Sequence, residues 1–513
     1  MREPAPLWSA RLVAAGLAVV LSAATAVAVD RQGETHDRAS RSGSAGVPTA
    51  GAAAAPTPFA ESARAQAARV DADPASPGEQ ERTGRASEPR AAGADPAPTA
   101  ARPPRPSSPG ASSSRPTTSI VERPDAAERR EAAEALLAVR GRAVLDRDRA
   151  AFLATVDPRS TRFRARQAAL FDALAQVPLT SWSYALHPED AQRADPRLDR
   201  RRGTWWAPRV TVRHALRDVD REPAESTQHL TFTQRGGRWY VAADDDFTHR
   251  GDRTQRQLWD GGPVVAVHGK SSTVLGHPGS LPEMRRIARD VDAAVPKVAA
   301  WWGSWRGRVA VLVPQDQAEL AGLVETRGGL GPIAALAVAG PVRDGRARGG
   351  DRVLVNPRNL ARLSPVGRRV VLTHEVTHVA TRAATGPLVP AWLAEGVADH
   401  VGYAGTGVST ELAAAELRAD VRAGRVPSRL PRDEDFDGDN PRLPQAYEQA
   451  WLAVEELVDT YGERRVRAFY RALGSRQRGE PAAALDAALH AELGTSTRAF
   501  TATWRASVRR QLG

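Results

Sequence analysis

The residues best suited to chemistry lie in one short stretch, 370–401, which reads VVLTHEVTHVATRAATGPLVPAWLAEGVADHV and holds three of the chain's eleven histidines. His374 and His378 are four residues apart, so on a helix their imidazoles stand one turn apart on the same face and can reach one metal ion. Glu375 would then lie beside the coordination position left for water, where its carboxylate can take a proton. The H-E-x-x-H spacing therefore predicts a metal site suited to hydrolysis.

A third ligand is expected from the next helix, because a hydrolytic zinc site uses three protein ligands and keeps one position open for water. Glu395 and Asp399 are four residues apart and share a helix face, whereas His400 is turned away from Glu395. We therefore expect Zn²⁺ on the two histidines and Glu395, with Asp399 as the acceptor that orients one histidine. His400 and Asp399 are the alternative third ligands.

The segments HEVTH and WLAEGVADH together resemble the gluzincin zinc metallopeptidases, in particular the peptidase MA-like bacterial members with a W-L-x-E-G-x-A signature. The resemblance covers about 258–513 and implies hydrolysis of a peptide bond by a zinc-activated water, with Glu375 as general base. The metzincin class is excluded, since VATRAA after His378 lacks the glycine and histidine which that class requires. Glu395 follows His378 by seventeen residues, fewer than in thermolysin-like relatives, which implies a tight connection through 385–390.

The same resemblance implies a tyrosine or histidine on a later helix that stabilises the oxyanion. The segment LPQAYEQAWLAVEELVDTYG has the form of the tyrosine-bearing helix of the family, so Tyr447 is the expected catalytic donor. Tyr403, just after the ligand helix, is the alternative donor. The competing interpretation of Tyr447 is an ordinary aromatic residue between packed helices.

The helices and strands that must position these residues are predicted from helix start and stop signals and from hydrophobic periodicity. Ser364-Pro365 is a helix start and Gly386-Pro387 a helix stop, which places HEVTH inside a helix. Upstream, GPVVAVHG and RVAVLVP are expected strands separated by a helix over 281–302, and AALAVAG forms an expected hairpin with DRVLVNP. Everything after Ser364 has a helical pattern. We expect one domain over 258–513, with a mixed sheet that leads into a helical C-terminal lobe.

Residues 125–252 form a second expected domain, of two helices followed by a curved antiparallel sheet. Asp125 can cap the first helix, RFRARQAALFDALAQV follows as the second, and SWSYALHP, WWAPRVTVRHALRDV, STQHLTFTQ and RWYVAADDD are expected strands. This order of elements resembles the nuclear-transport-factor-2-like, or SnoaL-like, cone fold, which often encloses a pocket. The predicted fold class is therefore α+β. The expected apolar face of the first helix is Ala132, Leu136, Val139, Ala143 and Val144, and the aromatic residues that either line a pocket or fill the core are Trp182, Tyr184, Trp205, Trp206, Trp239 and Tyr240.

The N-terminal region is predicted to direct the chain out of the cytoplasm. Arg2 and Arg11 precede eighteen uncharged residues, Leu12 to Val29, so 1–29 is expected to be a signal peptide or a signal anchor. Either outcome places the folded part outside the cytoplasm, secreted or tethered to the membrane. Residues 30–124 are rich in alanine, proline, serine and arginine, and they cannot bury enough apolar surface to offset their conformational entropy. We expect a disordered tether there.

The composition narrows the chemistry and the partners. The 513 residues include no cysteine, which excludes thiolate zinc ligands, cysteine nucleophiles, lipoprotein anchoring and disulfides. The net charge of +11 comes almost entirely from arginine, and the alanine and arginine usage is typical of a high-GC bacterial genome. We therefore expect no nucleic-acid partner, and instead a peptide or protein substrate and contact with an anionic envelope surface.

Two further interpretations concern an acidic loop and the function as a whole. The loop 433–441 matches the first half of a calcium loop, but Pro444 stands where a bidentate glutamate is required, so a solvated acidic loop is expected. The competing functions are a catalytically silent docking module on a metallopeptidase scaffold and a basic protein that binds envelope polymer. The second of these predicts salt-sensitive adhesion that persists in Glu375→Gln.

Overall fold

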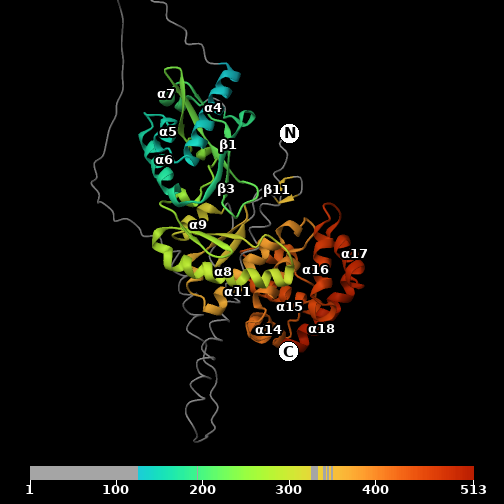
Figure 1. Ribbon diagram of the computed structural model, residues 1–513. Helices are drawn as coiled ribbons and strands as arrows, with labels where there is room; N and C mark the ends of the chain where they lie inside the picture. Colours follow the sequence, from blue (N-terminus) through green and yellow to red (C-terminus); the bar gives the residue numbers. More distant parts are fainter. Residues whose placement is uncertain (1–124, 193–194, 325–332, 339–341, 344–345, 348–349) are drawn as a thin grey trace, which may run out of the picture. The chain divides into compact units, whose positions relative to one another are not determined.

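The computed structural model describes residues 125–192, 195–324, 333–338, 342–343, 346–347 and 350–513 (Figure 1). The predicted signal at 1–29 and the predicted tether at 30–124 lie outside the described residues. The fold is α+β, with a mixed sheet and a helical C-terminal region, as the sequence predicted. None of the helices in the described ranges is long and apolar enough to cross a membrane.

The first part of the chain is built from helices and two small antiparallel sheets. Helix α4 (Ala126–Leu145) begins at the predicted cap, where the Asp125 carboxylate accepts a hydrogen bond of 3.3 Å from the backbone N–H of Ala127. The sheets have the strand orders β1-β3-β4 and β2-β5-β6. The remaining elements are α5 (Arg149–Ala154), α6 (Thr161–Ala173), β1 (Leu179–His187), α7 (Pro196–Arg202), β2 (Trp205–Trp206), β3 (Arg209–Leu216), β4 (Ala224–His229), β5 (Thr231–Arg235) and β6 (Arg238–Ala243).

The buried face of α4 agrees with the prediction at Ala143 and Val144 and differs in the first half of the helix. Ala133 and Leu137 are buried, whereas Val139 is 41% exposed. Arg140 is buried as well, which the apolar pattern could not predict. Its guanidinium lies 3.8 Å from the centroid of the Phe152 ring and donates a hydrogen bond to Gln167. The arginine stem thus fills a place in the core while its charge is satisfied by π and amide groups.

The predicted aromatic residues of this part contribute both to the core and to a pocket. Trp206 and Trp239 belong to a buried apolar cluster, so the core interpretation is correct for them. Trp182 is likewise a buried core residue, and together with the half-buried Tyr184 it also lines a pocket between β1 and α4.

The second part contains a five-stranded mixed sheet with the order β10-β13-β9-β8-β7. Strands β8, β9 and β13 are parallel, and β7 and β10 pair antiparallel at the two edges. The predicted hairpin of AALAVAG with DRVLVNP is confirmed, since Ala335 pairs with Val355. The sequence did not predict β8. The strands are β7 (Val265–His268), β8 (Ser272–Gly276), β9 (Val309–Val313), β10 (Ala335–Val338) and β13 (Arg352–Val355), with the short pair β11 (Val342–Arg343) and β12 (Arg346–Ala347).

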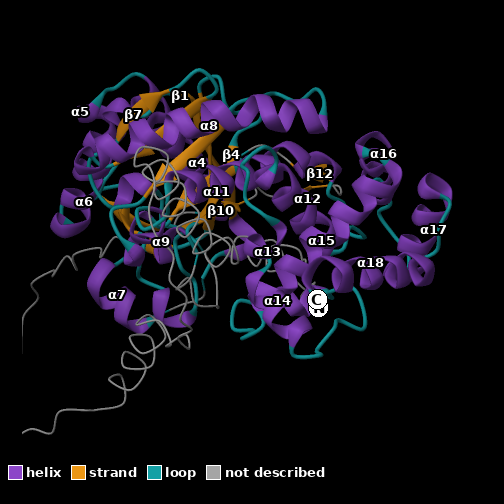
Figure 2. Cartoon of the chain, turned by 90° about the horizontal axis from the view of Figure 1, so that it is seen from below, coloured by secondary structure: helices purple, strands orange, loops and turns teal. Residues whose placement is uncertain are grey.

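Helix α8 (Leu281–Trp302) joins the sheet to the helical region. Its buried residues recur at helical spacing, from Met284 and Ile287 to Val298, and this face packs against the sheet and against α11 (Figure 1). Helices α14 to α18 lie together, apart from the five-stranded sheet (Figure 2). The remaining helices are α9 (Gln317–Leu323), α10 (Pro357–Leu360), α11 (Pro365–Thr381), α12 (Ala391–Tyr403), α13 (Thr410–Ala413), α14 (Ala415–Arg422), α15 (Leu443–Tyr461), α16 (Glu463–Gly474), α17 (Pro481–Leu493) and α18 (Thr497–Leu512).

The two parts share a continuous buried core. The ring of Trp259 lies 5.8 Å from the ring of Trp182 and 5.1 Å from that of His214, centroid to centroid. Beside them, Asp220 and Arg352 form a buried, two-point ion pair with N···O distances of 2.8 and 2.7 Å. Removal of residues 125–252 would therefore expose core side chains of the second part and leave the charge of Arg352 without its partner.

Candidate metal centre

Helix α11 carries the H-E-x-x-H motif because its start is strongly specified. The Ser364 hydroxyl accepts a 3.1 Å hydrogen bond from the backbone N–H of Gly367, and Pro365 occupies the first helical turn. His374, Glu375 and His378 lie in the middle of the helix, and their side chains are buried. A regular helix thus places both imidazoles on one face, as the spacing predicted.

The predicted third ligand, Glu395 on α12, meets the two histidines. The Nε2 atoms of His374 and His378 are 3.0 Å apart, and Glu395 Oε2 lies 3.2 Å from the first and 3.3 Å from the second. Among the described residues, these three form the group whose ligand atoms could hold a metal ion together.

These distances fit a zinc ion. Tetrahedral zinc with bonds of 2.0–2.1 Å holds neighbouring donor atoms roughly 3.3–3.4 Å apart. The Nδ1 atom of His374 lies 2.8 Å from the Asp399 carboxylate, so Nδ1 carries the proton and Nε2 turns its lone pair toward His378 and Glu395. Glu395 Oε2 is buried and makes no hydrogen bond within the described ranges. Lone pairs that converge in a buried place repel one another unless a cation lies between them.

Asp399 therefore takes the position that the sequence predicted for it. Burial lowers the pKa of His374, but the nearby carboxylates, Asp399 first and then Glu395 and Glu375, together outweigh burial and raise that pKa well above its ordinary value. Burial raises the pKa of Asp399, and His374 opposes this rise. A carboxylate that holds the far nitrogen of a ligand histidine fixes the ring's tautomer and its orientation.

Glu375 lies beside the three donors, and its carboxylate has no hydrogen-bond partner among the described residues. Glu375 is fully buried. Burial raises the pKa of Glu375, and the charges of His374 and His378 oppose this rise. The backbone N–H of Ala337 on β10 also favours the charged form, although it does not reach hydrogen-bond geometry. A buried acceptor without a partner is costly, which points to a function for it.

Close helix packing fixes α12 against its neighbours on two sides. A Cβ atom on Gly402 would lie 3.1 Å from the carbonyl oxygen of Val370 on α11. A Cβ atom on Gly396 would lie 2.7 Å from the carbonyl carbon of Ala450 and 2.7 Å from Val454 Cγ2, both on α15. The glycine that follows Glu395 thus lets α15 approach the ligand helix at the level of the site.

The predicted tight connection between α11 and α12 is present and is held by α16. Thr385 Oγ1 lies 2.8 Å from the hydroxyl of Tyr470, which is fully buried. Gly386 and Gly474 approach each other so closely that a side chain on either would collide with opposing backbone. Neither contact was predicted, because the partners in the hydrogen bond are 85 residues apart in sequence.

The two tyrosines considered for the oxyanion lie in different surroundings. Tyr447 on α15 is buried, with its ring centroid 6.5 Å from that of His374 and 5.1 Å from that of Phe436. Tyr403 packs against Trp451, with ring centroids 5.0 Å apart. The structure thus places Tyr447 next to a metal-ligand candidate. His400, the alternative ligand, has its Nδ1 atom 2.7 Å from Glu455 on α15 and is absent from the group of converging donors.

The acidic loop 433–441 contacts the start of α12, the helix that carries Glu395. Asp433 accepts a 2.9 Å hydrogen bond from the backbone N–H of Ala391, the first residue of α12. Asp435 pairs with Arg429 at 2.6 Å. Pro390, at the N-cap of α12, has no side chain that can accept a hydrogen bond, so Asp433 acts as the cap from a distant segment. The helix that carries Glu395 is anchored in this way.

No protein-family model matches the chain, and no curated protein matches it. Two solved structures of yeast LTA4 hydrolase show a distant likeness. The complex with bestatin is 16% identical with a TM-score of 0.27, over 42% of this chain and 33% of that chain. The native enzyme is 11% identical with a TM-score of 0.31, over 66% of this chain and 70% of that chain. This chain thus spans about a third of the bestatin-bound chain, and TM-scores this low do not establish a shared fold.

Proposed function

We propose that the protein is an extracytoplasmic zinc-dependent metallopeptidase. The observation that carries the proposal is the meeting of three unsaturated donor atoms, from His374, His378 and Glu395, at separations that suit tetrahedral zinc. These residues would hold the metal. A bound zinc ion supplies Lewis acidity toward water and toward a carbonyl oxygen.

Glu375 is proposed as the general base. Its carboxylate is buried on the same helix as the two histidines and has no hydrogen bond to a described residue, so its oxygens are available to accept a proton from the attacking water. The same carboxyl group then gives this proton to the leaving amine. One group can do both if the attacking water and the leaving nitrogen each come within hydrogen-bond reach of its carboxylate.

Tyr447 is proposed to donate a hydrogen bond to the oxyanion. Its ring lies against His374, whereas Tyr403 is engaged with Trp451, and this difference favours Tyr447. Asp399 is a positioning residue that holds His374 through Nδ1.

An extended peptide is the substrate that best suits the surroundings of the site. Strand β10 packs against α11 and pairs on one side with β13, which leaves its other side as a sheet edge within the described ranges. Such an edge offers backbone donors and acceptors to an extended chain, which can add as a further strand. A peptide held along β10 would pass close to Glu375. The backbone N–H of Ala337 on β10 is near enough to the Glu375 carboxylate to favour its charged form.

The location and the partners are proposed from the sequence. Residues 1–29 have the form of a signal peptide or a signal anchor, which favours a secreted or membrane-tethered enzyme acting outside the cytoplasm. The charge of +11 favours contact with an anionic envelope surface over binding of nucleic acid.

A docking module is the second candidate, and one observation favours it. The three donor side chains are almost entirely buried, and His378, at 9%, has the largest exposed fraction of the three. A site this closed suits a scaffold that binds a partner on its surface without admitting a peptide.

Hydrolysis of casein by the full-length chain separates the two candidates. We expect zinc-dependent cleavage that a chelator abolishes and added zinc restores. Glu375→Gln should keep its zinc and lose at least about 100-fold in rate, in the range of general acid–base catalysis. Zinc binding without cleavage of casein or of a diverse peptide library would favour the docking module, and full activity of Glu375→Gln would remove Glu375 from the mechanism.

A further inference from the structure

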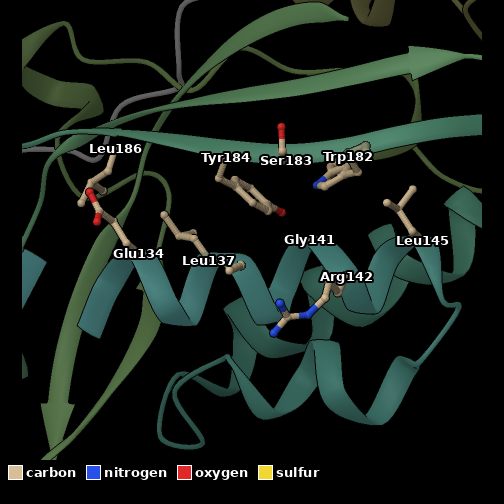
Figure 3. A pocket seen from close by; sticks show the side chains of 10 residues that line it. Glu134, Leu137, Gly141, Arg142, Leu145, Trp182, Ser183, Tyr184 and Leu186 are labelled. Atoms are coloured by element: carbon tan, nitrogen blue, oxygen red, sulfur yellow. The ribbon is translucent and has the colours of Figure 1, made fainter. Parts of the chain in front are cut away.

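A pocket of about 280 Å³ lies between α4 and β1, in the first part of the chain and outside the metal centre (Figure 3). This volume is near the small end of the range of about 300–1,000 Å³ for ligand sites. The walls are mostly apolar. The residues that matter here are Leu137, Gly141, Leu145, Trp182, Tyr184 and Leu186.

One wall of the pocket depends on Gly141, where helix α4 and strand β1 approach each other closely. A Cβ atom on Gly141 would lie 3.1 Å from the carbonyl oxygen of Trp182 and 3.7 Å from Cδ2 of Tyr184. Without that side chain, the two aromatic rings can stand beside the helix and form one wall. Leu145 adds an apolar edge at the mouth, where it is 40% exposed.

One buried polar atom in this wall has no partner. The indole Nε1 of Trp182 makes no hydrogen bond to a described residue, although Trp182 is only 6% exposed. Its ring neighbours Tyr184, His214 and Trp259 contact it through their aromatic faces and edges. Figure 3 shows the indole nitrogen and the Tyr184 hydroxyl both turned toward the space between β1 and α4. A buried indole N–H normally has an acceptor, so an acceptor oxygen is expected in the pocket.

The charges at the rim favour an anion. Glu134 is neutralised by Arg130, with an N···O distance of 2.8 Å. Arg142 also lines the pocket, and within the described ranges its guanidinium forms no ion pair. Arg142 is therefore a cation of the pocket lining that has no ion-pair partner among the described residues, next to an indole N–H that has no acceptor.

We propose that this pocket binds a small, largely apolar carboxylate. Its apolar body packs on Leu137 and Tyr184, an oxygen accepts the Trp182 N–H, and Arg142 balances its charge. This inference is independent of the proposed peptidase function, because none of these residues belongs to the metal centre.

Calorimetric titration of the full-length chain with benzoate, phenylacetate and 3-phenylpropionate tests the proposal. Benzamide is the neutral counterpart of benzoate and has nearly the same shape. Ala138→Trp places a large side chain at the mouth, since Ala138 is exposed and lines the pocket. Ala135→Trp is the matched control, because Ala135 is exposed on the same helix and does not line the pocket. His378→Ala is included because carboxylates also bind zinc.

We expect saturable 1:1 binding of at least one of the three acids, unchanged in Ala135→Trp and in His378→Ala. Ala138→Trp should weaken binding at least about tenfold while it melts at the same temperature as Ala135→Trp. Arg142→Gln should weaken benzoate about fivefold and leave benzamide unchanged. Absence of saturable binding for all three acids, equal binding to Ala138→Trp, or loss of binding in His378→Ala would overturn the proposal.

Discussion

The substitution Gly396→Ala tests how closely the ligand helix and α15 approach each other. An added Cβ would lie 2.7 Å from the carbonyl carbon of Ala450 and 2.7 Å from Val454 Cγ2, and closer still to the carbonyl oxygen of Ala450. Carbon atoms in contact lie about 3.5–4.0 Å apart, so the helices must separate by at least about 0.8 Å. Because the collision is with backbone, it cannot be relieved by rotation of a side chain.

Overpacking of this kind costs about 1–3 kcal/mol, and a backbone contact belongs near the upper end of that range. Alanine is also the better helix former, by about 0.8–1 kcal/mol, so a net loss of stability means that packing outweighs propensity. Glu395 precedes the altered residue, and a displaced α12 moves its carboxylate away from the histidines. We therefore expect lower stability together with weaker zinc binding.

Urea unfolding of the full-length chain and competition for zinc with a chelator provide the two measurements. Gly322→Ala is the matched control, because Gly322 is helical and nothing lies within 4 Å of its added Cβ. The control should be unchanged or up to about 1 kcal/mol more stable. Gly396→Ala with the stability and zinc affinity of the control would refute the close approach of α12 and α15.

Three further predictions concern buried charges. Asp399→Ala should weaken zinc binding about 10–100-fold in chelator competition, because His374 loses the acceptor on Nδ1, and unchanged affinity would contradict its positioning role. Asp220→Asn should cost about 3–5 kcal/mol in urea unfolding by leaving Arg352 buried without its counter-charge, and the double change Asp220→Leu with Arg352→Met should recover most of this loss. Burial is the main cause, and the facing Glu416 carboxyl the second, of a rise in the pKa of Glu448 from 4.5 to about 10. Between these two pH values, the carboxyl group of Glu448 keeps its proton in the folded protein and loses it in the unfolded chain. Stability should therefore fall as the pH rises from about 6 to 9, by at most about 1.4 kcal/mol per pH unit, and thermal melts of Glu448→Gln should show a smaller slope.

The sequence predicted elements well where the signals are local. Helix α8 spans Leu281 to Trp302 as predicted. The prediction was possible because apolar residues recur at helical spacing along all 22 residues of this helix. The short strand β8 was missed, since five residues carry too little alternation to indicate a strand. The face of α4 was predicted only in part: Ala143 and Val144 are buried as expected, whereas Val139 is exposed and Arg140 is buried, against the rule that places apolar residues inside.

The candidate site shows the same division between local and distant signals. Helical spacing alone brings His374 and His378 together, and it also puts Asp399 on the face of Glu395. The supports of the site come from far along the chain, as with Asp433, which caps α12 from 42 residues away. No periodicity reports such a contact, and only the packed fold reveals it.

The zinc content of the full-length chain, measured beside that of His378→Ala, tests the central claim most directly. Removal of one of three donors should abolish binding, since His374 and Glu395 alone leave the ion without its third protein ligand. The account predicts about one zinc per wild-type chain and none in the variant. A freshly purified wild-type chain that contains no zinc and takes up none on titration would contradict it.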